Sequence, residues 1–135
     1  MKEVQYLLDV LEELKENAGQ VDEREVEEMA AAILRAKRVY VAGAGRSGFA
    51  ARAFANRLMH LGLTVFFAGE PTTPAIGEGD LLIIGSGSGE TESLVVMAQK
   101  ARRLKAEVAT VTIHPEASIG KLSASCLVLP GTTPK

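Results

Sequence analysis

Residues 38–48 read Arg-Val-Tyr-Val-Ala-Gly-Ala-Gly-Arg-Ser-Gly, and this stretch decides the fold. Its first half is a short apolar run rich in β-branched residues, which is typical of a buried strand. The glycine-rich turn in its second half is typical of a strand that leads directly into a helix. A helical pattern then continues to Leu61, and Gly62 is placed to end it. We therefore expect a strand, a tight turn and a helix in succession.

The same strand-and-helix unit repeats along the rest of the chain. Further apolar and helical patterns predict strands at residues 64–67, 80–84, 108–113 and 126–129, and helices at 91–104 and 116–123. The segment 68–79 is too rich in turn residues for a helix and predicts a loop. Strands that alternate with helices indicate an α/β fold, a three-layer sandwich with a five-stranded parallel sheet. In the flavodoxin-like strand order 2-1-3-4-5, the first and third strands would be neighbours.

Two amphipathic helices are expected within residues 1–36, ahead of the sheet. Apolar residues recur at helical spacing over residues 4–14, and Asp22 with Glu25 three residues later is a helix-start signature for the second helix. A sheet that is already covered by its own crossover helices does not fully bury the first apolar stripe. We therefore expect residues 1–135 to form one domain that self-associates through this stripe.

The composition favours a globular protein without membrane or nucleic-acid contacts. The 135 residues include 15 Lys and Arg against 17 Asp and Glu, with a pI near 5.7, which argues against a broad nucleic-acid surface. No run of about 18 apolar residues predicts a membrane span, so we expect a cytoplasmic protein. The acidic charge is concentrated in residues 1–34, and the remainder is mildly basic, which suits either a small anionic ligand or an ordinary solvated surface. The lone Cys126 is expected to be a buried small hydrophobe.

The first glycine-rich turn also fits a dinucleotide-binding motif. Gly43, Gly45 and Gly48 have the spacing G-x-G-x-x-G, and Glu70 follows a little over twenty residues later. The acid of such a site should lie at the tip of the second strand, whereas Glu70 falls in the loop beyond it. A dinucleotide oxidoreductase is therefore one alternative, supported by this motif alone.

A second glycine-rich loop, Gly-Ser-Gly-Ser-Gly-Glu-Thr-Glu-Ser at residues 85–93, predicts an anion site. Its glycines let backbone amides approach a ligand, its hydroxyls can donate, and the N-terminus of the following helix adds positive charge. Without the Gly-Lys-Ser/Thr of nucleotide triphosphatases, a monophosphate is the expected anion. Adjacent first and third strands would bring Arg46 and Ser47 to the same pocket. Alternatively, the loop is only a tight turn in which Ser88 caps the helix.

At these residues the chain resembles the sugar isomerase (SIS) domain of phosphosugar isomerases and regulators, and within that family the 6-phospho-3-hexuloisomerases. The stretches that carry the resemblance are residues 43–48, 56–62, 69–74 and 85–93. The resemblance implies a small phosphosugar as the ligand and assembly through the helices into a tetramer or dimer, and the composition adds no membrane or nucleic-acid partner. It implies a place in the ribulose monophosphate pathway. It also implies a phosphate held by Ser47, Ser86, Ser88 and Thr91, together with Gly45, Arg46, Gly87 and Gly89.

The implied reaction moves a ketone from C3 to C2 of a hexulose 6-phosphate through a cis-enediol, with no metal or cofactor required. It needs a base at the C2 proton and donors for the enediolate oxygen. Glu70 and His60 are the candidates for the base; His60 lies far along its helix from the first loop and could reach a pocket only across a subunit boundary. His114 and Glu90 are expected to be structural.

The ending of the chain sets a further expectation. The hexuloisomerases continue past the position of Lys135 with a long helix that carries a glutamate thought to act in proton transfer. We therefore expect the 135-residue chain to bind a phosphosugar and turn it over slowly, because a phosphate cradle alone binds substrate and transition state almost equally. The alternative is a non-catalytic SIS module that binds or senses a phosphosugar.

Overall fold

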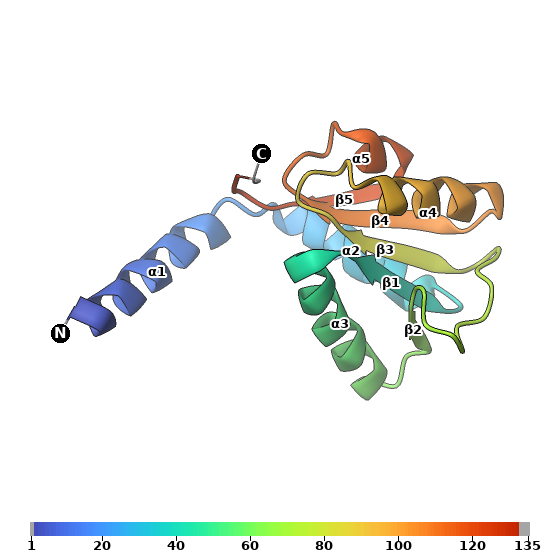
Figure 1. Cartoon of the computed structure of the whole chain (residues 1–135), viewed down its shortest axis with the longest axis horizontal. Helices are drawn as coiled ribbons and strands as arrows, with labels where there is room; N and C mark the ends of the chain where they lie inside the picture. Colours follow the sequence, from blue (N-terminus) through green and yellow to red (C-terminus); the bar gives the residue numbers. More distant parts are fainter. Residues whose placement is uncertain (1, 133–135) are drawn as a thin grey trace.

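The structure, a computed structural model, describes residues 2–132 and confirms the α/β sandwich with its five parallel strands in the order β2-β1-β3-β4-β5 (Figure 1). The loop expected at residues 68–79 is also present. The helices and strands are α1 (Lys2–Ala18), α2 (Glu23–Arg35), β1 (Val39–Gly43), α3 (Gly45–His60), β2 (Val65–Phe67), β3 (Leu81–Gly85), α4 (Glu92–Arg103), β4 (Glu107–Thr112), α5 (Ser118–Leu122) and β5 (Ser125–Val128).

The two faces of the sheet are covered by different helices. Along β1, Val39 and Val41 point into an apolar cluster with α2 and α3, whereas Tyr40 and Ala42 point into a second cluster with α4 and α5. Because both faces are covered, β1 and β3 read as continuous apolar runs rather than as alternating patterns. The core therefore holds the carboxyl ends of the strands rigidly, and the glycine-rich loops leave from those ends.

The register of β1 and β3 brings the two glycine-rich loops together. The strands pair in parallel from Val39 opposite Leu81 to Gly43 opposite Gly85, so both end on a glycine at the same level. The expected neighbourhood of the first and third strands is thus confirmed. Two loops that start side by side can contribute to one site.

Asp22 and Gly62 have the helix-end roles that the local sequence predicts, whereas Glu25 does not. The Asp22 side chain accepts a hydrogen bond from the Arg24 amide at 2.8 Å and caps α2, and Gly62, with φ of +90°, ends α3. Glu25 does not complete a capping box. Its Oε1 accepts instead from the Val128 amide at 3.0 Å, because α2 packs beside β5 and that edge strand offers unpaired donors.

The loop between β2 and β3 is held by a buried carboxylate at the amino ends of the strands. Asp80 is 1% exposed and accepts from Arg38 Nε and Nη2 at 3.0 and 2.8 Å, and from the Gly77 amide at 2.8 Å. The Tyr40 hydroxyl donates to the Ala75 carbonyl in the same loop. The segment is therefore fixed without secondary structure of its own.

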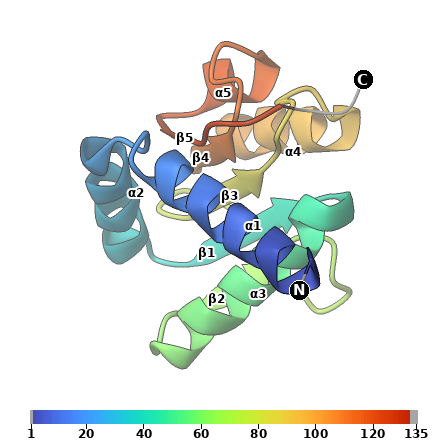
Figure 2. The same ribbon diagram turned by 90° about the vertical axis from the view of Figure 1, so that its left-hand side faces the viewer.

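Helix α1 projects away from the body of the molecule (Figures 1 and 2). It has no buried residue, and Leu7 and Leu11 are 57% and 52% exposed. Most of the stability of a helix in a protein comes from the packing of its apolar face, and α1 leaves that face exposed within one chain. Across residues 2–132, no helix is both long and apolar enough to cross a membrane.

Candidate functional site

The first loop is shaped by two glycines that allow α3 to lie close to β1. A Cβ on Gly48 would meet the Gly43 carbonyl oxygen at 2.8 Å, which is closer than real Cβ contacts come. Gly45 has φ of +58°, a left-handed conformation that favours glycine. The helix N-terminus therefore begins directly at the end of β1, and Ser47 lies in its first turn.

In the second loop, two serine hydroxyls are held in place by hydrogen bonds from backbone amides of the same loop. Ser86 Oγ accepts from the Gly89 amide at 3.0 Å, and Ser88 Oγ accepts from the Glu90 amide at 3.1 Å. A hydroxyl that accepts one bond can still donate its proton to a ligand. Thr91 is the N-cap of α4 and its side chain makes no capping bond, so the N–H groups of the first turn retain capacity for an anion.

A cavity of about 640 Å³ lies at the junction of the two loops, on the α2 and α3 side of the sheet. Ser47 and Ser86 both line it, as do Gly85 and Gly87. The structure therefore brings residues of the two loops to one cavity, although they lie about forty positions apart in the sequence. Ser88, Gly89 and Thr91 continue the second loop beyond the lining of this cavity.

Most of the cavity wall is apolar, and sequence reasoning missed it. Its larger apolar side chains come from α2, α3, β5 and the residues that follow β4 and β5, and include Val26, Met29, Ile33, Phe54, Ile113, Leu127 and Leu129. Phe54 had a signal in the sequence, because it follows Ser47 by seven residues and lies two helical turns along the same face. The contributions of α2 and of the segment after β5 had no local signal, since only the packing brings them there.

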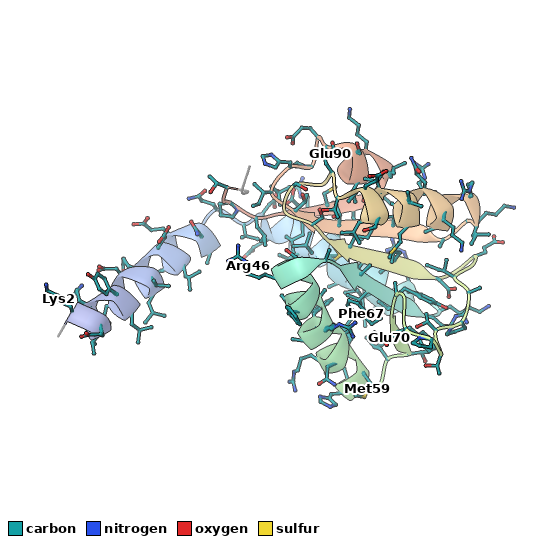
Figure 3. The ribbon with its side chains drawn as sticks, viewed as in Figure 1. Lys2, Arg46, Met59, Phe67, Glu70 and Glu90 are labelled. Carbon is teal, nitrogen blue, oxygen red and sulfur yellow. The ribbon has the colours of Figure 1, made fainter. Side chains whose placement is uncertain are left out.

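Arg46 and Glu90 flank the loops without entering the cavity. Arg46 is exposed in the first turn of α3 and reaches outward from it (Figure 3). The Glu90 carboxylate accepts from the Ser118 amide at 2.9 Å and from the Ser118 hydroxyl, and these bonds lower the pKa of Glu90 below its ordinary value. Glu90 therefore caps the first turn of α5 and stays ionised beside the second loop.

The candidate bases lie away from the cavity within this chain. His60 is the last residue of α3, thirteen residues and about 20 Å along the helix from Ser47. Glu70 follows the edge strand β2 and pairs with Arg52, whose guanidinium stacks on the Phe67 ring at 4.0 Å (Figure 3). Neither His60 nor Glu70 lines the cavity formed by residues 2–132.

The remaining titratable candidates have structural surroundings. His114 Nδ1 lies 3.2 Å from Glu116 Oε1 in the turn after β4. Burial, with the negative charge of Glu25, raises the pKa of the Cys126 thiol, which lies 3.8 Å from the Gly120 carbonyl oxygen. The half-buried Cys126 thiol is therefore held in its protonated form at neutral pH.

Comparison with known proteins supports the resemblance to the SIS family. The model of the SIS domain matches residues 32–133. The Bacillus subtilis protein named 3-hexulose-6-phosphate isomerase is 46% identical over 98% of the chain, and one of the same name from Mycobacterium gastri is 44% identical over 90%. The chain spans 71% and 61% of the lengths of these two relatives.

A solved structure from Methanococcus jannaschii extends the similarity to three dimensions. This protein, MJ1247, was described as a hypothetical protein whose structure infers a function of 3-hexulose-6-phosphate isomerase. It is 32% identical to the chain, with a TM-score of 0.82, over the whole chain and 76% of its own.

Proposed function

Because the chain belongs to the SIS domain family, we propose that it is a 6-phospho-3-hexuloisomerase, which interconverts 3-hexulose 6-phosphate and fructose 6-phosphate. The names of the relatives at 46% and 44% identity support phosphosugar isomerase function. The observation that carries the proposal is the meeting of two glycine-rich loops, with Ser47 and Ser86, at one cavity. A ligand with an anionic end and a neutral body suits a cavity with polar loops at one side and an apolar wall opposite.

The phosphate binds, in this proposal, at the hydroxyls of Ser47, Ser86, Ser88 and Thr91. The glycines Gly45, Gly87 and Gly89 keep the loop backbones accessible, and Arg46 offsets the charge of the dianion. The free N–H groups at the start of α4 support this arrangement, because a helix N-terminus stabilises an anion through its amides and its dipole. Charge-assisted bonds of this kind are about twice as strong as neutral ones.

Isomerisation then requires proton transfer at C2 and C3. A base removes the proton from C2, and the C2–H electrons form the C2=C3 bond as the C3 carbonyl oxygen becomes an enediolate oxygen. A proton passes from O2 to O3, and the base returns its proton to C3 as the ketone forms at C2. We propose Glu70 or His60 as this base, acting on substrate held by a second copy of the chain. Neither residue lines the cavity of its own chain, so this proposal requires that each reaches its substrate across a subunit boundary.

The alternative is a non-catalytic SIS module that binds or senses a phosphosugar. The ion pair between Glu70 and Arg52 and the distant position of His60 favour it, because phosphate binding alone does not accelerate proton transfer. In either case we propose that residues 1–135 form a single SIS domain with N-terminal helices in residues 1–36. We further propose that it is a cytoplasmic homo-oligomer, a tetramer or dimer, and that the isomerase acts in the ribulose monophosphate pathway.

Binding and turnover measured on the same protein separate these functions. Calorimetry with fructose 6-phosphate is expected to show binding, with NAD as the control ligand for a dinucleotide site. Turnover of 3-hexulose 6-phosphate is followed by coupling fructose 6-phosphate to glucose-6-phosphate isomerase and its dehydrogenase. Binding with turnover supports the isomerase, and binding without turnover supports the sensing module. A chain that bound NAD and no phosphosugar would overturn both.

A further inference from the structure

The second glycine-rich loop continues to pair with β4 after β3 has ended. The Ser86 amide donates to the Val111 carbonyl at 3.0 Å, and the Ile113 amide donates to the Gly87 carbonyl at 3.2 Å. These bonds extend the parallel ladder by two residues into the loop. The backbone at the end of β4 therefore holds the first residues of the loop in place.

A buried side-chain hydroxyl of β4 adds a further hydrogen bond to the loop. Thr112, the last residue of β4, is 2% exposed, and its Oγ1 donates to the Gly87 carbonyl at 3.3 Å and accepts from the His114 amide at 3.1 Å. One hydroxyl thus connects the loop to the turn after β4. Thr112 also lines the cavity, next to Gly87.

The direction of the Gly87 carbonyl determines where the next amide points. The Gly87 carbonyl and the Ser88 amide belong to one planar trans peptide, in which C=O and N–H point in opposite directions. With the carbonyl held toward β4 by Thr112 and Ile113, the Ser88 N–H points away from β4, toward the outer side of the loop. A bond to the carbonyl therefore orients an amide that can face a ligand.

The loop has little room to relax in another way. Gly89 has φ of +71°, and a Cβ there would meet Ala117 Cβ at 2.8 Å and the His114 carbonyl oxygen at 3.2 Å. The Gly89 carbonyl also accepts from the Ile119 amide at 3.0 Å. The far end of the loop is thus packed against the turn before α5, and its near end depends on the bonds to Gly87.

We propose that Thr112 is a positioning residue for the phosphosugar, which acts by holding the Gly87–Ser88 peptide with its amide toward the phosphate. The inference rests on the proposed function of the second loop as the phosphate site. Thr112 itself does not need to touch the ligand. Its hydroxyl fixes the loop before the ligand arrives, so that binding does not have to order it.

Thr110 supplies a matched control on the same strand. It is also fully buried on the same face of β4, and its hydroxyl donates to the Ile84 carbonyl at 2.8 Å, within β3 and ahead of the loop. Replacing Thr110 by Val removes an equivalent buried hydrogen bond without touching the loop. A loss of ligand affinity specific to position 112 therefore reports on positioning rather than on stability.

The test is calorimetry with fructose 6-phosphate on the wild type, Thr112→Val, Thr112→Ser and Thr110→Val, after thermal melting has shown each variant to be folded. We expect Thr112→Val to bind about tenfold more weakly, as the loss of one net hydrogen bond predicts. Thr112→Ser keeps the hydroxyl and is expected to bind within about twofold of the wild type, and Thr110→Val is expected to melt lower with its affinity unchanged. Thr112→Ala, which also lacks the hydroxyl, replaces Thr112→Val if the latter does not fold.

The outcomes separate the positioning role from the function on which it rests. Wild-type affinity in a folded Thr112→Val or Thr112→Ala, or an equal loss of affinity in Thr110→Val, would overturn the role of Thr112 alone. A wild type that binds no fructose 6-phosphate would overturn the proposed function, and the positioning role with it. Where turnover is measurable, the positioning role predicts a raised KM with little change in kcat, because phosphate binding is shared by substrate and transition state.

Discussion

At the scale of single residues, the two serines of the second loop have different surroundings. Ser86 is 4% exposed and holds the Gly89 amide inside the loop, whereas Ser88 is half-buried and holds only the adjacent Glu90 amide. The loss of Ser86 would therefore alter the shape of the loop as well as its donors. Ser88 is the better position at which to measure the contribution of one hydroxyl to phosphate binding.

We predict that Ser88→Ala weakens fructose 6-phosphate binding by about 1.5–3 kcal/mol, the contribution of one hydrogen bond to a charged group. The measurement is calorimetry at constant ionic strength. Ser123→Ala is the control, because the Ser123 hydroxyl donates to the Ile119 carbonyl at 2.8 Å, within α5 and its C-terminal end. Equal affinities for Ser88→Ala and the wild type would remove Ser88 from the proposed phosphate site.

Asp80 is the buried charge on which the loop between β2 and β3 depends. Burial alone would raise the pKa of Asp80, but the hydrogen bonds from Arg38 and the Gly77 amide, with the charges of Arg38 and Lys37, outweigh it and lower the pKa. A carboxyl whose pKa is lower in the folded protein stabilises the fold above its unfolded pKa of about 3.9. That stabilisation is lost as the pH falls through the folded pKa.

We predict that Asp80→Asn lowers the free energy of unfolding by about 2–3 kcal/mol at pH 7, because it removes hydrogen bonds to a charged group. The difference from the wild type should begin to shrink below about pH 4, where the Asp80 carboxyl of the unfolded chain takes up a proton, and should vanish as the pH falls through the lower pKa of the folded protein. Urea unfolding at pH 7, 5, 4 and 3 measures it. Glu107→Gln, which breaks the exposed pair with Arg35, is the control and should change stability by less than about 1 kcal/mol. A difference that stayed constant down to pH 3 would contradict the assignment.

At the scale of elements, the contact between β1 and α3 depends on a glycine pair. A Cβ on Gly48 would meet backbone atoms of Gly43 and would push the first turn of α3 away from β1. Ser47 lies in that turn and would be displaced with it. We predict that Gly48→Ala destabilises the protein by about 1–3 kcal/mol, as overpacking does, and also weakens phosphosugar binding. Thermal melting and calorimetry measure the two effects.

The control for this substitution is Gly77→Ala. A Cβ on Gly77 would meet nothing within 4 Å, and the amide that donates to Asp80 is retained. Gly77→Ala should therefore leave both stability and affinity close to those of the wild type. If the two alanine variants behaved alike, the close approach of α3 to β1 would not be what positions Ser47.

At the scale of the whole molecule, α1 is the part that one chain does not stabilise. Its leucines are about half exposed, and none of its residues is buried. We predict that light scattering at tens of micromolar protein gives a mass well above the 14.3 kDa of one chain. Leu7→Glu combined with Leu11→Glu should shift the mass toward the monomer, because it places charge on the apolar stripe.

Gln5→Glu controls for the added charge. Gln5 lies on the polar face of α1, where its side chain bonds to Asp9 at 2.9 Å, and a glutamate there should leave the mass unchanged. A wild type that scattered as a single chain would disprove self-association through α1. Dissociation by Gln5→Glu as readily as by the leucine variants would point to net charge rather than the apolar stripe.

Local patterns in the sequence are sufficient to predict the elements and their order. The run of residues 38–48 predicts β1, its turn and α3, because burial on both faces and a left-handed glycine are properties of a few adjacent residues. The same reasoning predicts the loop at residues 68–79, and the alternation of strands and helices predicts a parallel sheet. Resemblance to the SIS family then indicates the class of ligand.

Only the tertiary structure decides which of these residues meet. The register of β1 and β3 places the starts of the two glycine-rich loops side by side. The packing of α2 adds apolar side chains to the cavity wall, which the sequence of α2 alone does not predict. Glu25, which reads locally as half of a capping box, bonds to β5, and Glu90, at the start of α4, caps α5. Each of these contacts joins residues far apart in the chain, so its energy depends on how the elements pack and not on the spacing of their sequence.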